Sequence, residues 1–332
     1  MLEEDLDQGI KNLMRLTVES GAPNCNRLNE TLRTLPHLLL NTKTLAYELS
    51  RLKSVIDQTQ HGHPQLGHYG LTTKLCTAAD LESSWAAYWI RQLRIPVVYH
   101  RKNWELCFVM QALYESLTRF ESKHGLGFAC GMEKIPSCLA SLNAVITATD
   151  APPEVSGVER WSRTRQHSSG RDQLFHADLI SMEAFESRVC FDFVDMNEIP
   201  DQYQGRFDFC WSICAAEHLG SIENGMRFME NSLGVLKSGG VAVHTLEFNL
   251  DEGETIDGWP TVLFQRRHIE ELSQRVSKAG GTLYTPDYDE GRSYHDRYVD
   301  TPPYNAIANQ IHLKLDIDGF RCTCIGLILR KN

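Results

Sequence analysis

Glycines and acids recur in this sequence at the spacing of a nucleoside-binding site. Gly127 and Gly131 follow an apolar run, and glycines at a strand-to-helix turn let the backbone approach a ligand closely. Asp150 follows about 20 residues later, where an acid in a doubly wound fold accepts both ribose hydroxyls. Asp195 ends the next predicted strand and Met196 follows it, where a carboxylate can accept from the adenine amine and a thioether can lie on the ring. Together these residues predict a nucleoside site.

Three further segments belong to the same pattern. Ser212–Leu219, with the sequence SICAAEHL, ends one predicted strand, and Leu236–Gly240, LKSGG, precedes another. His312–Lys331 reads as two strands around an Asp-Gly turn. With the nucleoside residues above, this combination resembles the class I S-adenosylmethionine-dependent methyltransferases, from about Leu126 to the C-terminus.

The resemblance implies S-adenosyl-L-methionine as the cofactor and methyl transfer as the reaction. It also implies a Rossmann-like α/β fold: a doubly wound, mostly parallel sheet that ends in an antiparallel β-hairpin. Dinucleotide dehydrogenases usually lack that hairpin. On this resemblance the cofactor lies along residues from several loops, namely Gly127, Ala129, Gly131, Glu133, Asp150, Asp195, Met196, Ser212 and Arg101.

The glycine loop departs from the family's usual form, an acid followed by three glycines at alternate positions. Gly127 stands at the acid position, Ala129 at the first glycine and Glu133 at the third, so Gly131 alone is retained. S-adenosylmethionine has no pyrophosphate, so fewer glycines are sterically required. Two other hypotheses remain: a non-catalytic methyltransferase-like partner protein, and a nicotinamide dehydrogenase, since residues 125–130 approach a dinucleotide fingerprint.

Two charged side chains suit the methionine end of this cofactor. Glu133 lies near the start of a predicted helix and is placed to receive the ammonium group. Arg101, in the segment before the sheet, is placed to pair with the carboxylate through its planar guanidinium. The alternative for this second segment is an ordinary helix start with Asn103 as the N-cap.

Candidate bases follow the fourth and fifth strands, since catalytic groups of open sheets lie at the strand ends. Glu217 and His218 follow the fourth strand, and His218 is the first candidate because imidazole titrates near working pH. Glu247 ends the fifth strand and faces the side opposite His244. The alternatives are that His218 only orders its loop and that Glu247 is a solvated edge carboxylate. Whole segments resemble methyltransferases of bacterial surface-glycan and secondary-metabolite pathways, which implies a small-molecule or sugar hydroxyl as acceptor.

Short apolar runs alternate with amphipathic stretches from Gly125 onward. The runs at residues 126–131, 144–150, 189–195, 207–215 and 241–248 predict strands. The stretches at residues 135–142, 223–236 and 266–281 predict helices, and residues 236–240 predict a tight turn. Such alternation indicates an open parallel sheet with helices on both faces.

Residues 1–98 predict an N-terminal helical extension, and residues 99–332 predict the methyltransferase domain. Within the extension, Pro36 is expected to interrupt a first helical stretch, and Asn41 or Thr42 to cap a second. The extension either packs on the domain or forms an oligomerisation hairpin. The second alternative makes a homodimer through the N-terminal helices a partner hypothesis.

Composition excludes several classes of protein. The 332 residues include 33 Lys and Arg and 43 Asp and Glu, a net charge of −10, which argues against nucleic acid as the main partner. No apolar run reaches the ~18 residues of a membrane span, and the start MLEEDLDQG lacks the basic region of a signal peptide. The ten cysteines form no CxxC pair, which predicts reduced thiols and a cytoplasmic protein. The histidines of residues 61–68 have no cysteine or carboxylate at ligand spacing, so we expect no metal.

Overall fold

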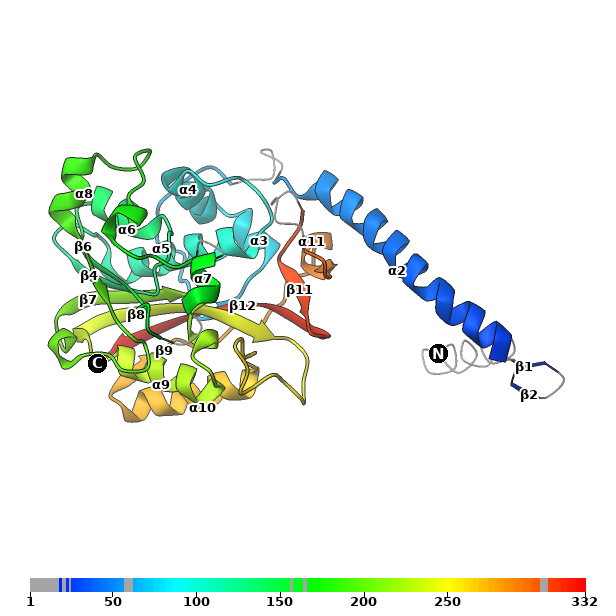
Figure 1. Ribbon diagram of the computed structural model, residues 1–332. Coiled ribbons are helices and arrows are strands. Elements are labelled where there is room, and N and C mark those ends of the chain that lie inside the picture. Colours follow the sequence, from blue (N-terminus) through cyan, green and yellow to red (C-terminus); the bar gives the residue numbers. More distant parts are fainter. Residues whose placement is uncertain are drawn as a thin grey trace. The chain divides into compact units, whose positions relative to one another are not determined.

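The computed structural model is drawn in Figure 1. The residues that it describes are 18–19, 22–23, 25–56, 62–155, 158–163, 166–304 and 310–332. The chain divides into two compact units, Met1–Lys53 and Ser54–Asn332, which we describe separately.

Five parallel strands form the body of the sheet in the second unit. They are β4 (His124–Phe128), β5 (Val145–Asp150), β6 (Val189–Phe193), β7 (Phe207–Ile213) and β8 (Leu236–Asn249). Their spatial order is β6–β5–β4–β7–β8, so the chain reverses direction across the sheet between β4 and β7. In doubly wound sheets, ligands bind at such a switch point, outside the carboxyl ends of the strands.

Antiparallel strands complete the sheet beyond β8. The long strand β12 (Phe320–Lys331) pairs antiparallel with β8 and, through the turn at Asp318-Gly319, with β11 (Lys314–Ile317). The remaining short strands are β9 (Gly281–Leu283) and β3 (Lys74–Leu75), which pair with β12, and β10 (Val299–Asp300), which pairs with β11. A mostly parallel sheet that ends in an antiparallel hairpin confirms the expected fold class.

Helices cover both faces of this sheet, as the strand–helix alternation predicts (Figure 1). On one face lie α4 (Ser84–Leu93), α5 (Arg101–Leu117), α6 (Ile135–Ser141) and α8 (Met182–Arg188). On the other lie α9 (Ile222–Ser232) and α10 (Arg266–Lys278). The shorter helices are α3 (Ala78–Leu81), α7 (Val158–Arg163) and α11 (Tyr294–Arg297), with the 3₁₀ turns η1 (Arg171–Leu174), η2 (Asp201–Tyr203) and η3 (Ala216–His218).

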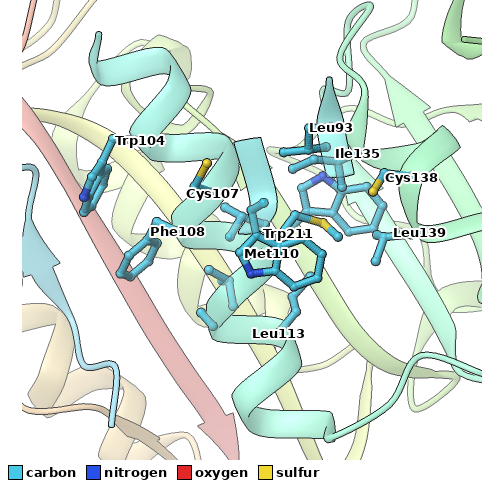
Figure 2. Close-up of a cluster of buried hydrophobic side chains, with 14 of the residues drawn as sticks. Leu93, Trp104, Cys107, Phe108, Met110, Leu113, Ile135, Cys138, Leu139 and Trp211 are labelled. Carbon is cyan, nitrogen blue, oxygen red and sulfur yellow. The ribbon is translucent and has the colours of Figure 1, made fainter. Parts of the chain in front are cut away.

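Large aromatic side chains fill the core between the sheet and α5 (Figure 2). Trp104, Phe108 and Trp211 are completely buried there. Phe108 lies so close to Gly326 of β12 that a Cβ atom added at this glycine would overlap the ring. The glycine therefore allows helix and sheet to approach closely.

The described residues between Ser54 and Val98 pack into the same core. Trp85 and Trp89 of α4 are buried, and Trp89 Nε1 donates a hydrogen bond of 2.8 Å to Gln111 of α5. The compact unit therefore begins at Ser54, ahead of the predicted boundary. The functional division into residues 1–98 and 99–332 stays a prediction.

Two local predictions are wrong. Helix α5 begins at Arg101, because the His100 side chain accepts the Lys102 N–H at 3.1 Å and acts as the N-cap, so Asn103 lies inside the helix. Residues 236–240 form no separate turn, because they begin strand β8. The pairing register between β7 and β8 shifts there, and Gly239 takes a positive φ of 76°, which accommodates the irregularity as a bulge.

In the described part of the first unit, the long helix α2 (Cys25–Lys53) follows the short strands β1 (Val18–Glu19) and β2 (Ala22–Pro23). The helix continues through Pro36 and past residues 41–42, so the predicted interruption and N-cap are wrong. A proline removes one backbone hydrogen bond, and the leucine-rich sequence on both sides favours helix strongly enough to continue. The start of the first predicted helical stretch, and His61, lie outside the described residues. Within the described part of the chain, no helix is long and apolar enough to cross a membrane.

Candidate functional site

The glycine loop leaves β4 at the switch point of the sheet. Its backbone turns sharply, with positive φ at Ala129 (48°) and Gly131 (53°). The Thr149 hydroxyl of β5 donates to Gly127 O at 2.8 Å, and Cys130 N–H donates to Thr149 O at 2.9 Å. These two bonds fix the loop to the end of the neighbouring strand.

Asp150 lies directly beside this loop, as its position at the end of β5 predicts. Its carboxylate accepts three backbone N–H groups: Gly131 at 3.1 Å, Ser168 at 2.8 Å and Ala151 at 2.8 Å. Burial raises the pKa of the Asp150 carboxyl group, and the N–H donors oppose that shift. The acid thus joins the glycine loop to the segment around Ser168.

That segment also covers Gly131. A Cβ atom added at Gly131 would lie 2.5 Å from the Gln166 carbonyl oxygen. Sequence reasoning missed Gln166 and Ser168, because their backbone groups make the contacts and any residue type supplies those groups. No side-chain pattern signals such a contact.

Glu133 follows the loop and is held by a tryptophan of the sheet. Trp211 Nε1 donates to Glu133 Oε1 at 2.7 Å. Burial raises the pKa of Glu133 to about 8, and the nearby Asp150 carboxylate acts in the same direction, so Glu133 carries a proton at neutral pH.

Asp195 and Met196 follow β6 as predicted. Asp195 Oδ1 accepts the Asn197 N–H at 2.8 Å, and Met196 is buried in the core on the α9 side of the sheet. Beside them, Asn197 Oδ1 is a buried acceptor with no hydrogen-bond partner among the described residues. An amide oxygen in that state suits a ligand N–H.

Ser212 is placed on the opposite face of β7 from Trp211. Its hydroxyl lies 2.8 Å from His244 Nδ1, and His244 Nε2 lies 3.0 Å from the Ser232 hydroxyl of α9. Burial lowers the pKa of His244 to about 3, so this imidazole is neutral. The described contacts of Ser212 are therefore with a buried structural network, and its role toward a cofactor stays a prediction.

A cluster of charged side chains surrounds Arg101 at the carboxyl ends of β7 and β8. Arg101 Nη2 lies 2.5 Å from Glu247 Oε1, and its Nη1 lies 3.3 Å from Glu105 Oε1 and 3.8 Å from Cys214 Sγ. The two carboxylates raise the pKa of the guanidinium well above its usual value against the effect of burial. Its Nε donor is buried and has no hydrogen-bond partner among the described residues.

The predicted bases Glu217 and Glu247 lie together in this cluster. Glu247 N–H donates to Glu217 Oε1 at 3.3 Å, and both side chains are buried. Burial, and next the Glu247 charge, raise the pKa of Glu217 to about 8. The expected orientation of β8 is confirmed, since Glu247 contacts Arg101 while His244 contacts α9. The interpretation of Glu247 as a solvated edge carboxylate is wrong, because α5 and η3 cover it.

His218 has a different set of neighbours. Its Nδ1 lies 3.0 Å from the Pro260 carbonyl oxygen and 3.3 Å from the Thr261 hydroxyl, and its ring lies 4.3 Å from that of Trp161 in α7. A carbonyl only accepts, so Nδ1 is the donor and a neutral ring carries its lone pair on Nε2.

Sequence reasoning missed three members of the charged cluster, namely Lys102, Glu105 and Cys214. Lys102 Nζ lies 2.9 Å from Glu105 Oε2. The spacing of Arg101 and Glu105, four residues apart on a helix, was a usable signal for an ion pair. Cys214 had no comparable signal, because its place depends on the tertiary fold.

Comparisons with known proteins return likeness of fold at low sequence identity. No protein-family model and no curated protein matches the chain. The [4+2]-cyclase SpnF is 18% identical, with 67% of this chain and 79% of that chain covered and a TM-score of 0.42. A putative S-adenosylmethionine-dependent methyltransferase from Listeria monocytogenes is 13% identical, with coverage of 66% and 96% and a TM-score of 0.38. The magnesium protoporphyrin IX methyltransferase of Synechocystis, solved with bound SAH, is 9% identical, with coverage of 73% and 92% and a TM-score of 0.39. Likenesses at this level concern the fold alone.

Proposed function

We propose that this protein is an S-adenosylmethionine-dependent O-methyltransferase that acts on a small-molecule or sugar acceptor. One observation carries the proposal: at the switch point, the Asp150 carboxylate accepts the Gly131 N–H, so acid and glycine loop form one cradle for a nucleoside. The antiparallel hairpin at the end of the sheet favours methyl transfer over hydride transfer to nicotinamide.

The residues around this cradle fit the cofactor. Asp150 offers its carboxylate to the ribose hydroxyls. A carboxylate accepts about four hydrogen bonds, and three backbone N–H groups already donate to Asp150. For both ribose hydroxyls to bind, the hydrogen bond from the Ser168 N–H must break. The unpartnered Asn197 Oδ1 suits the adenine amine, and the unpartnered Arg101 Nε suits the methionine carboxylate. Glu133 is placed for the ammonium group.

The chain's own contribution to the reaction is binding, alignment and control of charge. When bound, the cofactor supplies a methyl group already activated by a sulfonium sulfur. Asp150 and the loop 127–131 hold the nucleoside, while Trp211 fixes the direction of the Glu133 carboxyl group. Rigid placement of both reactants lowers the barrier of such a displacement.

His218 is our candidate for the base that takes the acceptor's proton. The Pro260 carbonyl and the Thr261 hydroxyl orient the ring at Nδ1, which sets the tautomer in which Nε2 is basic. Glu217 and Glu247 are weaker candidates, since Glu217 holds a proton at neutral pH and Glu247 is paired with Arg101. The Trp161 ring beside His218 offers an apolar face of the kind that packs against sugar C–H groups.

Product analysis with labelled methyl donor tests the acceptor class. We expect methyl transfer to the hydroxyl of a sugar, a sugar nucleotide or another small alcohol, and a fall of at least about 100-fold in kcat for His218→Ala. His268→Ala, which changes a histidine of α10, is the matched control and should leave kcat unchanged. Methylation of amines or carbon acids with no product from hydroxyl acceptors would contradict the proposal.

A second candidate function is a non-catalytic partner protein that dimerises through its N-terminal helix. Two observations favour it: the Ser168 N–H already occupies Asp150, and α2 exposes a row of leucines. Cofactor binding separates the two functions, because only the enzyme needs it.

We place either function in the cytoplasm, as is typical of a chain whose nine described cysteine side chains are all free thiols.

A further inference from the structure

Three metal-binding side chains converge inside the charged cluster at the carboxyl ends of β7 and β8. One ligand atom from each of Cys214, Glu217 and Glu247 lies within 4.8 Å of the others. Glu217 is fully buried and Glu247 is only 5% exposed, while Cys214 is partly exposed. A buried carboxylate is stable in its ionised form only when a positive charge lies beside it.

Each carboxylate of the trio has one anchored oxygen and one open oxygen. Glu217 Oε1 accepts the Glu247 N–H, and Glu247 Oε1 is held by Arg101. The other two oxygens, Oε2 of Glu217 and Oε2 of Glu247, are buried and have no hydrogen-bond partner among the described residues. Anchoring of one oxygen by a neighbouring group is how outer-shell partners direct the other oxygen toward a metal.

The charges in the cluster leave room for a divalent cation. When ionised, Cys214, Glu217, Glu247 and Glu105 are four anions, whereas Arg101 and Lys102 are the cations that contact them. Two negative charges are left over, which matches one divalent ion.

We propose that Cys214, Glu217 and Glu247 bind one divalent cation of the zinc class, with one thiolate and two carboxylate oxygens as ligands. Zinc accepts both thiolate and carboxylate ligands and keeps an open position in catalytic sites, whereas magnesium prefers oxygen ligands alone. That the ion lies on the acceptor side of the nucleoside cradle depends on the proposed function. The binding of the ion to these three residues does not depend on it.

Cobalt(II) titration of the full chain tests the proposal, because a cobalt–thiolate bond absorbs in the near ultraviolet. We expect one Co²⁺ per chain with that absorption, which added Zn²⁺ abolishes by displacement. Cys214→Ser should remove the absorption, and Glu217→Gln should weaken binding roughly tenfold or more. Cys190→Ser and Glu198→Gln, an exposed thiol and an exposed carboxylate outside the cluster, are the matched controls.

Circular dichroism of each variant confirms that it is folded before titration. The proposal is overturned if the folded wild type binds neither ion in large molar excess. It is also overturned if Co²⁺ binds without thiolate absorption, or equally well in Cys214→Ser and Glu217→Gln, which would place the ion elsewhere. No cofactor or acceptor is present in these titrations, so failure of methyl transfer does not affect the result.

Discussion

Glu133 is the residue whose protonation should report on the methionine end of the cofactor. Its carboxyl group carries a proton at neutral pH because burial raises its pKa to about 8. An ammonium group beside it would favour the charged carboxylate and lower that pKa. We therefore predict that S-adenosylmethionine binding at pH 7 releases up to one proton from Glu133, measured by calorimetry in buffers of different ionisation enthalpy.

Glu133→Gln is the variant for this prediction, because a glutamine oxygen still accepts the Trp211 N–H. It should bind the cofactor without the buffer-dependent heat. Proton release that persists in the variant would show that another group titrates, and its absence in the wild type would remove Glu133 from the ammonium site.

Gly127 is required by packing. A Cβ atom added there would overlap Cys130 Sγ and the Trp211 ring, which are both buried. We predict that Gly127→Ala lowers the unfolding free energy by about 1–3 kcal/mol, as overpacking of a core does. Gly170→Ala is the control, since nothing lies within 4 Å of an added Cβ there. Equal denaturant midpoints for the two variants would show that the loop relaxes freely.

The residue types in the sequence were enough to predict the acidic site residues and the glycine loop, but not the groups that bond to them in the fold. Asp150 could be predicted because it closes a strand at a fixed distance from the loop. Ser168 could not, because its backbone makes the contact, and neither could the pairing of Arg101 with Glu247. That pair joins residues far apart in sequence, so it depends on the fold.

At the scale of elements, β8 separates a buried neutral network from a charged cluster. His244 points toward α9 and is uncharged, since burial lowers its pKa to about 3. Between pH 3 and the ordinary histidine pKa of 6.5, the unfolded chain binds a proton at this residue that the native chain excludes. We predict that the unfolding free energy rises with pH across this window, by up to about 1.4 kcal/mol per pH unit, and gains nothing further from His244 above it.

His244→Gln should flatten this pH dependence while keeping hydrogen bonds to Ser212 and Ser232. Part of the slope should remain, because burial also lowers the pKa of His100 to about 3. His124→Gln, an exposed residue at the start of β4, is the control and should retain the wild-type slope. An unchanged slope in His244→Gln, measured by denaturant unfolding at several pH values, would contradict the assignment.

The strands and helices of the sheet could be predicted because each is a clear apolar run or amphipathic stretch. The exceptions have physical causes. Residues 236–240 contain two glycines and suggest a turn, but pairing with β7 incorporates them into β8 as a bulge. Pro36 suggests a helix end, but the leucines around it continue α2. In both cases the glycines or proline alone did not decide the local structure.

At the scale of the whole molecule, α2 raises the question of assembly. Leu38, Leu45 and Leu52 are spaced seven residues apart and are at least 59% exposed, and the exposed Leu35 and Leu49, fourteen residues apart, form a second row that Thr42 interrupts. A seven-residue apolar repeat is typical of a helix that pairs with another helix. We predict a dimer in light scattering that Leu45→Asp converts to a monomer.

Leu40→Asp is the matched control, because Leu40 is 63% exposed but lies outside both rows. It should remain dimeric. A monomeric wild type, or a dimer that survives Leu45→Asp, would exclude α2 as the contact between copies and would weaken the non-catalytic alternative.

The most direct test of the central claim is calorimetric titration with S-adenosylmethionine of the wild type and of Asp150→Asn, with NAD as the control ligand. Asparagine keeps an acceptor for the neighbouring N–H groups but removes the charge that holds the ribose. We predict binding to the wild type, a loss of about 1–2 kcal/mol in the variant, and no heat with NAD. A folded wild type that binds no S-adenosylmethionine, or a variant that binds it equally well, would contradict the account.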